Sequence, residues 1–435
     1  MRHAVLLTIF LVLLQVNAWA EEEAVKGNIL TLQTCIDKTL ASHPDIRKLL
    51  FEVEEKNAAI TSSKAAILPQ IFVSAEYDPI KTFVMPQNGR FLTDDHTAWR
   101  AGIGLTQKIY DFGSSRGRIK ASKLSKKMAA LSLKEAKRLL IYNVQTLYDA
   151  LLLQKAAMKA REEDIKNKEA LYLQAQELVK NGLKTKADEA SVLASVYSAK
   201  DAYFGAKSAF LKARVLMELY TGETIAIDTE YEDLLEKRSL IELGPKEEKE
   251  LNAIFLDKNS KMQIQKQAIR QSEALLASAK GERYGTIDAV ASYTRESNFS
   301  DYDTSMAGLK VEIPIFTGGL LKARVAQARA SAAQAKEAFS LQKLKLLSEF
   351  EGTLIDLHRA EAGIQARKAG MAAAREASDL MAARYREGLS TYVEVLGATA
   401  QHLDAKLGLL QARNNKSKAL YYIDYLMARG ENAHE

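Results

Sequence analysis

"WRAGIGLTQKIYDFGSSRGRI" (residues 99–119) begins as an alternating segment and ends in a glycine-containing turn. Strict alternation of apolar and polar side chains predicts a β-strand with one face of each kind. About ten residues of this pattern fit a strand of a transmembrane β-barrel with a water-filled lumen, although any half-buried sheet also alternates. The apolar positions are Trp99, Ala101, Ile103 and Leu105, and the polar face carries Arg100, Gly102, Gly104, Thr106 and Lys108.

The same pattern recurs 206 residues later, in "SMAGLKVEIPIFTGGLLKARV" (305–325). There the residues from Ala307 to Ile315 at every second position are apolar, in the same parity as in the first copy. Two less regular segments, 71–77 and 287–293, are expected to be strands as well. Four strands cannot close a barrel, and lipid does not tolerate open sheet edges. A membrane location therefore requires the chain to form an oligomer.

The two copies belong to a repeat that runs through the chain. Upstream of the strands the offset is 216, so the first half has ten extra residues between its strands, and we expect them to form a loop. We place repeat one at 29–221, a linker at 222–250 and repeat two at 251–430. The linker has no counterpart in either half. Each repeat is expected to run helix, strand, loop, strand, long helix, break, long helix.

Long helices are the other main feature. Between Arg118 and Asn181 there is neither Gly nor Pro, and a helix of that length spans roughly 95 Å. All six prolines are expected at helix starts, strand borders or connections, because proline is costly inside a helix. Apolar residues recur every seventh position, which predicts coiled-coil packing. The recurring positions are Val144, Leu151, Met158, Ile165, Tyr172 and Val179, and in the second half Phe350, Leu357, Ile364, Met371, Ser378 and Tyr385.

The N-terminus has the pattern of a secretory signal peptide over residues 1–20, with Ala18-Trp19-Ala20 as the cleavage site. No later segment has about eighteen uninterrupted apolar residues, so membrane insertion would have to use strands, in an outer membrane. The charge is mildly positive and mixed along the helices, which does not suggest nucleic-acid binding. Cys35 is the only cysteine, and the six histidines form no metal-ligand cluster. We find no catalytic constellation, and we predict no enzyme activity, metal or cofactor.

Two helix breaks share an unusual composition. "VKNGLKTKADE" (179–189) and "YREGLSTYVEV" (385–395) align under the 206 offset. Gly182 and Gly388 are expected to end one helix in the left-handed conformation, and Thr185 and Thr391 to begin the next. An ordinary helical hairpin explains these four residues. It does not explain why Leu183 and Leu389, or the carboxylates of Asp188 and Glu394, recur beside them.

The strand exits, the helix opening "ASHPDI" (41–46) and the two breaks resemble the TolC-like outer-membrane factor family over essentially the whole mature chain. The chain is therefore expected to be an α+β membrane protein with two structural repeats, four β-strands and long coiled-coil-like α-helices. The resemblance implies a homotrimer, with a 12-stranded β-barrel in the outer membrane of a Gram-negative bacterium, continued by a periplasmic α-helical barrel. An equatorial belt would come from the linker and the C-terminal tail.

The resemblance also implies a function. Such proteins are exit ducts of tripartite efflux pumps or type I secretion systems, passive channels that a periplasmic adaptor joins to an inner-membrane transporter of the RND, ABC or MFS type. Gly182, Leu183, Thr185, Gly388, Leu389 and Thr391 would form adaptor-docking hairpin tips. Asp188, Tyr385 and Glu394 would form the periplasmic gate, with Tyr385 and Asp188 in a hydrogen-bonded latch.

This chain departs from the family pattern at the gate. It has Ser390 where the family can carry an arginine, and Gly397 where it can carry a second aspartate. The departure predicts a looser resting closure. The alternative function is that of a secreted periplasmic coiled-coil scaffold, which accounts for the heptads but leaves the alternating strands without a purpose. The transported substrate, and the choice between efflux and protein secretion, are not predicted by the sequence.

Overall fold

The computed structural model describes residues 29–234, 236, 255–298 and 300–428. The predicted signal peptide, residues 235 and 237–250 of the predicted linker, and the end of the C-terminal tail lie outside the described residues. The chain divides into two compact units. One comprises Met1–Arg47, Ala136–Asn259 and Leu346–Glu435, and the other comprises Lys48–Glu135 and Ser260–Lys345.

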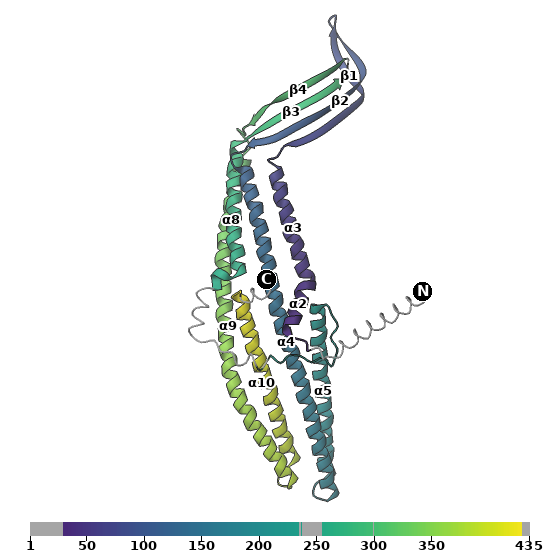
Figure 1. Cartoon of the computed structure of the whole chain (residues 1–435), viewed down its shortest axis with the longest axis vertical. Coiled ribbons are helices and arrows are strands. Elements are labelled where there is room, and N and C mark those ends of the chain that lie inside the picture. Colours follow the sequence, from purple (N-terminus) through teal and green to yellow (C-terminus); the bar gives the residue numbers. More distant parts are fainter. Residues whose placement is uncertain (1–28, 235, 237–254, 299, 429–435) are drawn as a thin grey trace, which may run out of the picture. The chain divides into compact units, whose positions relative to one another are not determined.

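The second unit contains a four-stranded antiparallel sheet in the order β1-β2-β3-β4 (Figure 1). The strands are β1 (Gln70–Gln87), β2 (Arg90–Tyr110), β3 (Thr286–Ser297) and β4 (Asp301–Glu312). The same unit contains four helical segments: most of α3 (Pro44–Ala65), α8 (Ser260–Gly281) and the N-terminal parts of α4 and α9. A short 3₁₀ turn, Glu282–Tyr284, connects α8 to β3.

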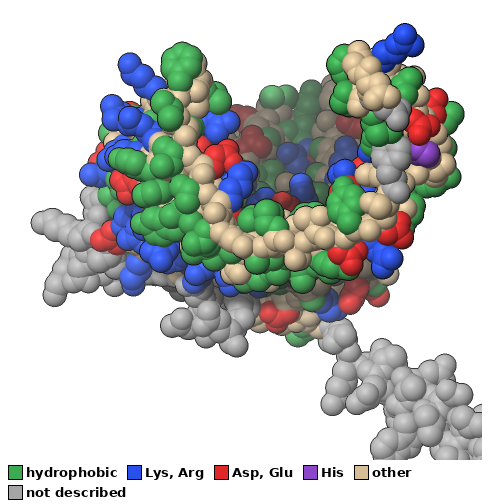
Figure 2. Space-filling view, turned by 90° about the horizontal axis from the view of Figure 1, so that it is seen from above, with side chains coloured by type: hydrophobic (Ala, Val, Ile, Leu, Met, Phe, Trp, Pro, Cys, Tyr) green, Lys and Arg blue, Asp and Glu red, His purple; other side chains and the backbone are tan. Residues whose placement is uncertain are grey.

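The register confirms the predicted faces of the sheet. Ile103 of β2 lies between Val73 of β1 and Tyr293 of β3, so the apolar positions of neighbouring strands share a face. On the opposite face, one row of paired residues runs across all four strands. Within this row, Arg100 Nε lies 2.9 Å from Glu296 Oε1. The row is Glu76, Arg100, Glu296 and Tyr302. The apolar face is exposed in the single chain, and Figure 2 shows hydrophobic side chains gathered on the outer side of the curved sheet.

Three sequence-based expectations about the strands were wrong. The ten extra residues of the first half do not form a loop: they lengthen β1 and β2, which pair as far as the turn at Asn88-Gly89. Strand β4 ends at Glu312, so Ile313 and Ile315 lie beyond it. Pro79 lies in the interior of β1 rather than at a border, and Pro86 is the second-to-last residue of the same strand. An edge strand tolerates proline because one side of it has no ladder bonds to lose, and Pro79 sits at a register shift of β1.

The first unit is helical. It contains α2 (Leu32–Ser42), the C-terminal parts of α4 (Ser114–Lys180) and α9 (Leu320–Arg386), and the whole of α5 (Lys186–Thr221) and α10 (Tyr392–Leu426). Helix α9 begins and ends 206 residues after α4, and α10 begins 206 residues after α5, as the repeat predicts. No helix in the described part of the chain is long and apolar enough to cross a membrane.

The heptad positions face the interior of this helical layer. Val144, Leu151, Phe350, Leu357 and Tyr385 are fully buried, and the remaining predicted heptad positions are buried or half-buried. Contacts between side chains fix the order of the helices as α9, α10, α4, α5 (Figure 1). Near the middle of the layer, Cys35 packs with Tyr148 in a core of α2, α4 and α5 side chains. Burial raises the pKa of the Cys35 thiol to about 11, consistent with a packing role.

Candidate functional site: the paired hairpin tips

The first hairpin tip ends α4 with a left-handed glycine. Gly182 has a φ of 74°, and its N–H donates to the carbonyl of Val179 at 3.0 Å. The next N–H, of Leu183, donates to the carbonyl of Leu178 at 2.8 Å, which completes a Schellman motif. The motif turns the chain away from the helix axis and leaves the Leu183 side chain 67% exposed.

A capping box then begins α5. The Thr185 hydroxyl accepts the N–H of Asp188 at 3.2 Å, and the Thr185 N–H donates to Asp188 Oδ2 at 3.0 Å. Each partner satisfies a backbone group that the helix start would otherwise leave open. Asp188 is therefore the third residue of the helix and is bound to its own N-cap.

The second tip repeats this chemistry residue by residue. Gly388 also has a φ of 74°, and the N–H of Leu389 donates to the carbonyl of Arg384 at 2.8 Å. The Thr391 N–H donates to Glu394 Oε2 at 2.7 Å, and the Glu394 N–H returns a bond to Thr391 Oγ1 at 3.3 Å. Leu389 is 63% exposed. Both tips thus present a leucine on a rigid turn.

The two tips pack against one another through an apolar cluster. Its buried members come from α4, α5, α9 and α10, so the cluster joins both hairpins: Leu171, Ala175, Val192, Tyr385 and Val395. Tyr385 is the largest of them and is 0% exposed. Burial raises the pKa of its hydroxyl, and the negative charge of Asp188 raises it further.

Lys184 also connects the tips, and our sequence analysis did not identify it. Its Nζ donates to the backbone carbonyl of Ser390 at 3.4 Å and lies 5.7 Å from the centre of the Tyr385 ring. The 206 offset aligns Lys184 with Ser390, which offered a signal: the cation missing at position 390 is present at the equivalent position of the other repeat.

The two predicted gate carboxylates are more acidic than usual. Hydrogen bonds from the backbone and then the hydroxyl of Thr185 lower the pKa of Asp188, and those of Thr391 lower the pKa of Glu394. The positive charge of Lys184 contributes to both shifts. Both groups are thus anionic at neutral pH.

Not every predicted contact is present in the single chain. Asp188 bonds to Thr185, and the Tyr385 hydroxyl has no hydrogen-bond partner among the described residues. The structure therefore brings Tyr385 and Asp188 close enough to influence each other electrostatically, without a direct hydrogen bond. Within the described residues, no group of three His, Cys, Asp or Glu side chains is arranged to hold a metal ion.

A sheet with an exposed apolar face, attached to long helices that end in capped hairpins, defines a subunit of an outer-membrane channel. The chain belongs to the outer membrane efflux protein family, whose model matches residues 35–223 and 254–427. The resemblance to TolC-like proteins and the predicted fold class are thereby confirmed. The fold is that of outer-membrane channel subunits of known structure, among them OprN and VceC.

Individual relatives are distant but cover most of the chain. Outer membrane efflux protein BepC of Brucella suis biovar 1 (strain 1330) is 22% identical over 410 residues, which are 91% of this chain and 87% of BepC. Outer membrane protein TolC of Escherichia coli (strain K12) is 25% identical over 403 residues, 86% of this chain and 77% of TolC. A crystal structure of CusC superposes with a TM-score of 0.81 at 16% identity and covers 92% of both chains.

Family membership also gives the location and the general role. The protein is an outer-membrane channel that extends into the periplasm, and it acts as an exit duct. A family of channels supports a transport role rather than an enzymatic one.

Proposed function

We propose that three copies of this chain form the outer-membrane duct of a tripartite export system, and that a periplasmic adaptor opens it by docking on the hairpin tips. The observation that carries the proposal is the pair of exposed leucines, Leu183 and Leu389, on turns of identical construction. An inner-membrane transporter of the RND, ABC or MFS type supplies the energy, so the duct itself needs no cofactor. Efflux of small molecules and type I secretion of a protein both use such a duct.

Assembly follows from the free edges of the chain. In the described sheet, β1 and β4 each pair on one side only, and lipid does not tolerate unpaired backbone groups. The β1 edge of one copy therefore pairs with the β4 edge of the next, and three copies give about twelve strands, enough for a water-filled lumen. Their apolar outer face contacts outer-membrane lipid.

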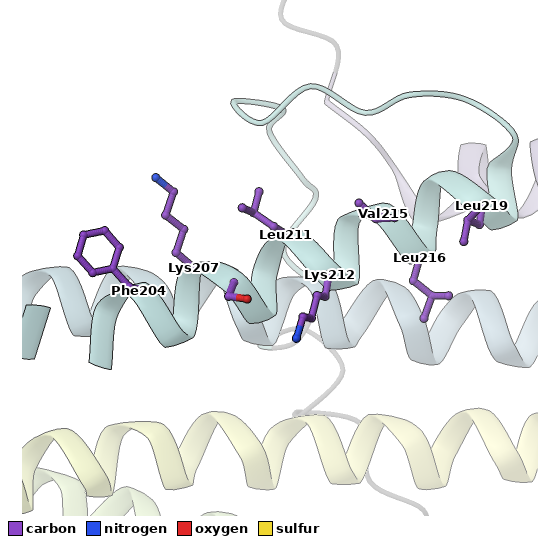
Figure 3. Close-up of a pocket in the computed structure, with 8 residues that line it drawn as sticks. Phe204, Lys207, Leu211, Lys212, Val215, Leu216 and Leu219 are labelled. Carbon is purple, nitrogen blue, oxygen red and sulfur yellow. The ribbon is translucent and has the colours of Figure 1, made fainter. Parts of the chain in front are cut away.

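The helical layer has a matching seam. Helix α5 forms one edge of the layer and carries a row of exposed apolar side chains, while α9 forms the other edge. Figure 3 shows this row along α5, with Lys207 and Lys212 beside it. Because rotation brings the α5 edge of one copy to the α9 edge of the next, we assign the row to the contact between subunits. Its apolar members are the exposed Phe204, Val215, Leu216 and Leu219 and the half-buried Leu211.

Docking uses the tips because of how they are built. The Schellman motifs hold the backbone of Leu183 and Leu389 in short, hydrogen-bonded turns, so little backbone entropy is lost when an adaptor helix covers them. A trimer presents six such leucines around one opening. Exposed apolar side chains on a rigid framework are suited to a protein partner rather than to solvent.

The gate lies at the same opening. Asp188 and Glu394 give six carboxylates in a trimer, and a ring of negative charge raises the local concentration of cations. Tyr385 lies behind them in the apolar cluster that joins the two hairpins. Opening would separate the two hairpins and divide the apolar cluster between them. A direct Tyr385–Asp188 hydrogen bond would require Asp188 to break its hydrogen bonds to Thr185.

Two pairs of substitutions separate docking from assembly. Leu183→Asp with Leu389→Asp is expected to leave the trimer intact and to abolish co-purification with the periplasmic adaptor of the host. Phe204→Asp with Leu219→Asp is expected to reduce the trimer itself, as measured by light scattering in detergent. Leu173→Asp, another exposed leucine on α4, is the control for the docking experiment. Retention of the adaptor by the double tip variant would contradict the docking proposal.

A further inference from the structure

Lys184 and Ser390 hold equivalent positions in the two repeats and are in direct contact. The Lys184 ammonium donates to the Ser390 carbonyl at 3.4 Å, across the boundary between the two hairpin tips. Ser390 is only 6% exposed, so its carbonyl lies in a sheltered position. The contact joins the loop before α5 to the loop before α10, which are about two hundred residues apart in the chain.

The same ammonium group faces the ring of Tyr385. A cation at 5.7 Å from the ring centre is within the range of a cation–π interaction. Tyr385 is fully buried, yet its hydroxyl has no hydrogen-bond partner in the described part of the chain. Packing and the ammonium group therefore hold this side chain in place, without help from its own hydroxyl.

Lys184 forms no ion pair with any residue that the structure describes. Its charge lowers the pKa of both Asp188 and Glu394, which places it in the field of the two carboxylates. Each carboxylate is nevertheless bound to its own N-cap threonine, and among the described residues neither forms a salt bridge with Lys184. The ammonium group therefore interacts with the Ser390 carbonyl and the Tyr385 ring at the same time.

We propose that Lys184 is a positioning residue of the gate: it fastens the first hairpin tip to the second and keeps Tyr385 buried in the resting channel. The fastening is one-sided, because the equivalent position of the second tip is Ser390, whose short side chain bonds to the Met381 carbonyl of its own hairpin. Each chain then contributes one such contact, and a trimer contributes three. The inference rests on the proposed gate at the tips and adds what holds that gate in its resting state.

Substituting Lys184 distinguishes this role from general stabilisation. Lys184→Met keeps an unbranched side chain that is one atom shorter and removes the charge, whereas Lys184→Arg keeps a cation that reaches the same carbonyl. Lys186→Met is the matched control, since Lys186 is an exposed lysine on the first turn of α5 and undergoes the same change of charge. None of these variants alters a capping residue or a residue of the apolar cluster.

The direct readout is the distance between the tips. Spin labels on Leu183→Cys and Leu389→Cys, in a Cys35→Ala background and diluted with unlabelled chains, report the distance within one chain of the purified trimer. We expect one narrow distribution in the wild type, a broader and longer one in Lys184→Met, and a wild-type distribution in Lys184→Arg and Lys186→Met. Open probability in planar bilayers should rise about two- to fivefold per broken contact in Lys184→Met, as expected from the strength of one such contact.

An unchanged distance distribution in Lys184→Met would overturn the proposal. So would an equal effect of Lys186→Met, because the cause would then be charge and not position. Neither measurement requires an adaptor. A failure of adaptor docking on the tips therefore leaves this test unaffected, and a failure of this test leaves the docking proposal standing.

Discussion

Glu394 is bound to the N-cap residue of its own helix, with the Thr391 N–H 2.7 Å from its Oε2. Loss of an N-cap side chain costs a helix start about 1 kcal/mol. We therefore expect Thr391→Ala to accelerate amide exchange in the first turn of α10, as measured by hydrogen–deuterium exchange and mass spectrometry. Ser340→Ala, which removes an exposed hydroxyl from the interior of α9, is the control and should leave that turn unchanged. Equal exchange in the two variants would show that the capping box does not hold the tip.

The acidity of the caps predicts how the tips respond to pH. The folded-state pKa values of Asp188 and Glu394 lie below their usual values of 3.8 and 4.5. A lowered carboxyl pKa gives stability that is fully present above the usual pKa and is lost as pH falls through the folded-state value. Amide protection at both tips should therefore be constant from neutral pH to about pH 5 and decline only in stronger acid.

Asp188→Asn and Glu394→Gln provide the comparison for this pH series. Both variants should lack the decline in strong acid, because neither amide titrates. A loss of protection at the wild-type tips between pH 7 and pH 5 would mean that other groups control them.

Because Gly388 is in a left-handed conformation and Gly397 is not, glycine-to-alanine substitution is expected to have opposite effects on stability at these two positions. Gly388→Ala introduces a side chain at a φ of 74°, which costs roughly 1–2 kcal/mol. Gly397→Ala lies inside α10 with open space around the new methyl group, so it should stabilise the helix by about 0.5–1 kcal/mol. Local opening free energies from amide exchange measure both. Destabilisation of similar size at both positions would contradict the assigned turn.

The two faces of β4 should respond differently to a charge. Leu309 is 71% exposed on the apolar face, and Met306 is 56% exposed on the opposite face. An arginine facing lipid near the centre of a bilayer costs about 2–4 kcal/mol, whereas one facing a water-filled lumen costs little. Leu309→Arg should reduce the amount of heat-modifiable trimer in outer-membrane fractions, and Met306→Arg should not. The reverse order would mean that the faces of the sheet are assigned the wrong way round.

The sequence predicted the tips well because their chemistry is local. Gly182, Thr185 and Asp188 act within a span of seven residues, and their second copy doubled the signal. Lys184 was missed because its partners, Ser390 and Tyr385, are about two hundred residues away and one of them is a backbone carbonyl. No property of Ser390 as a residue type indicates that its carbonyl accepts a bond from another hairpin.

The errors in the sheet have a similar origin. Pro79 and Pro86 indicate a break only if β1 is assumed to pair on both sides, and its position at an edge depends on the arrangement of all four strands. The lengths of β1 and β2 likewise depend on pairing beyond the repeat, which one sequence does not reveal. Long-range pairing, rather than local propensity, decided these features.

Three chains are expected to enclose one continuous aqueous duct with its constriction at the carboxylate-lined tips. Ion selectivity of the purified trimer in planar bilayers, measured from the reversal potential in a KCl gradient, tests it most directly. We predict a low-conductance, cation-preferring channel whose preference falls when Asp188→Asn is combined with Glu394→Gln. The preference should be unchanged by Asp201→Asn, because Asp201 is an exposed carboxylate in the middle of α5, away from the tips. Absence of channels would contradict the duct, and a cation preference unaffected by the double tip substitution would contradict a constriction lined by Asp188 and Glu394.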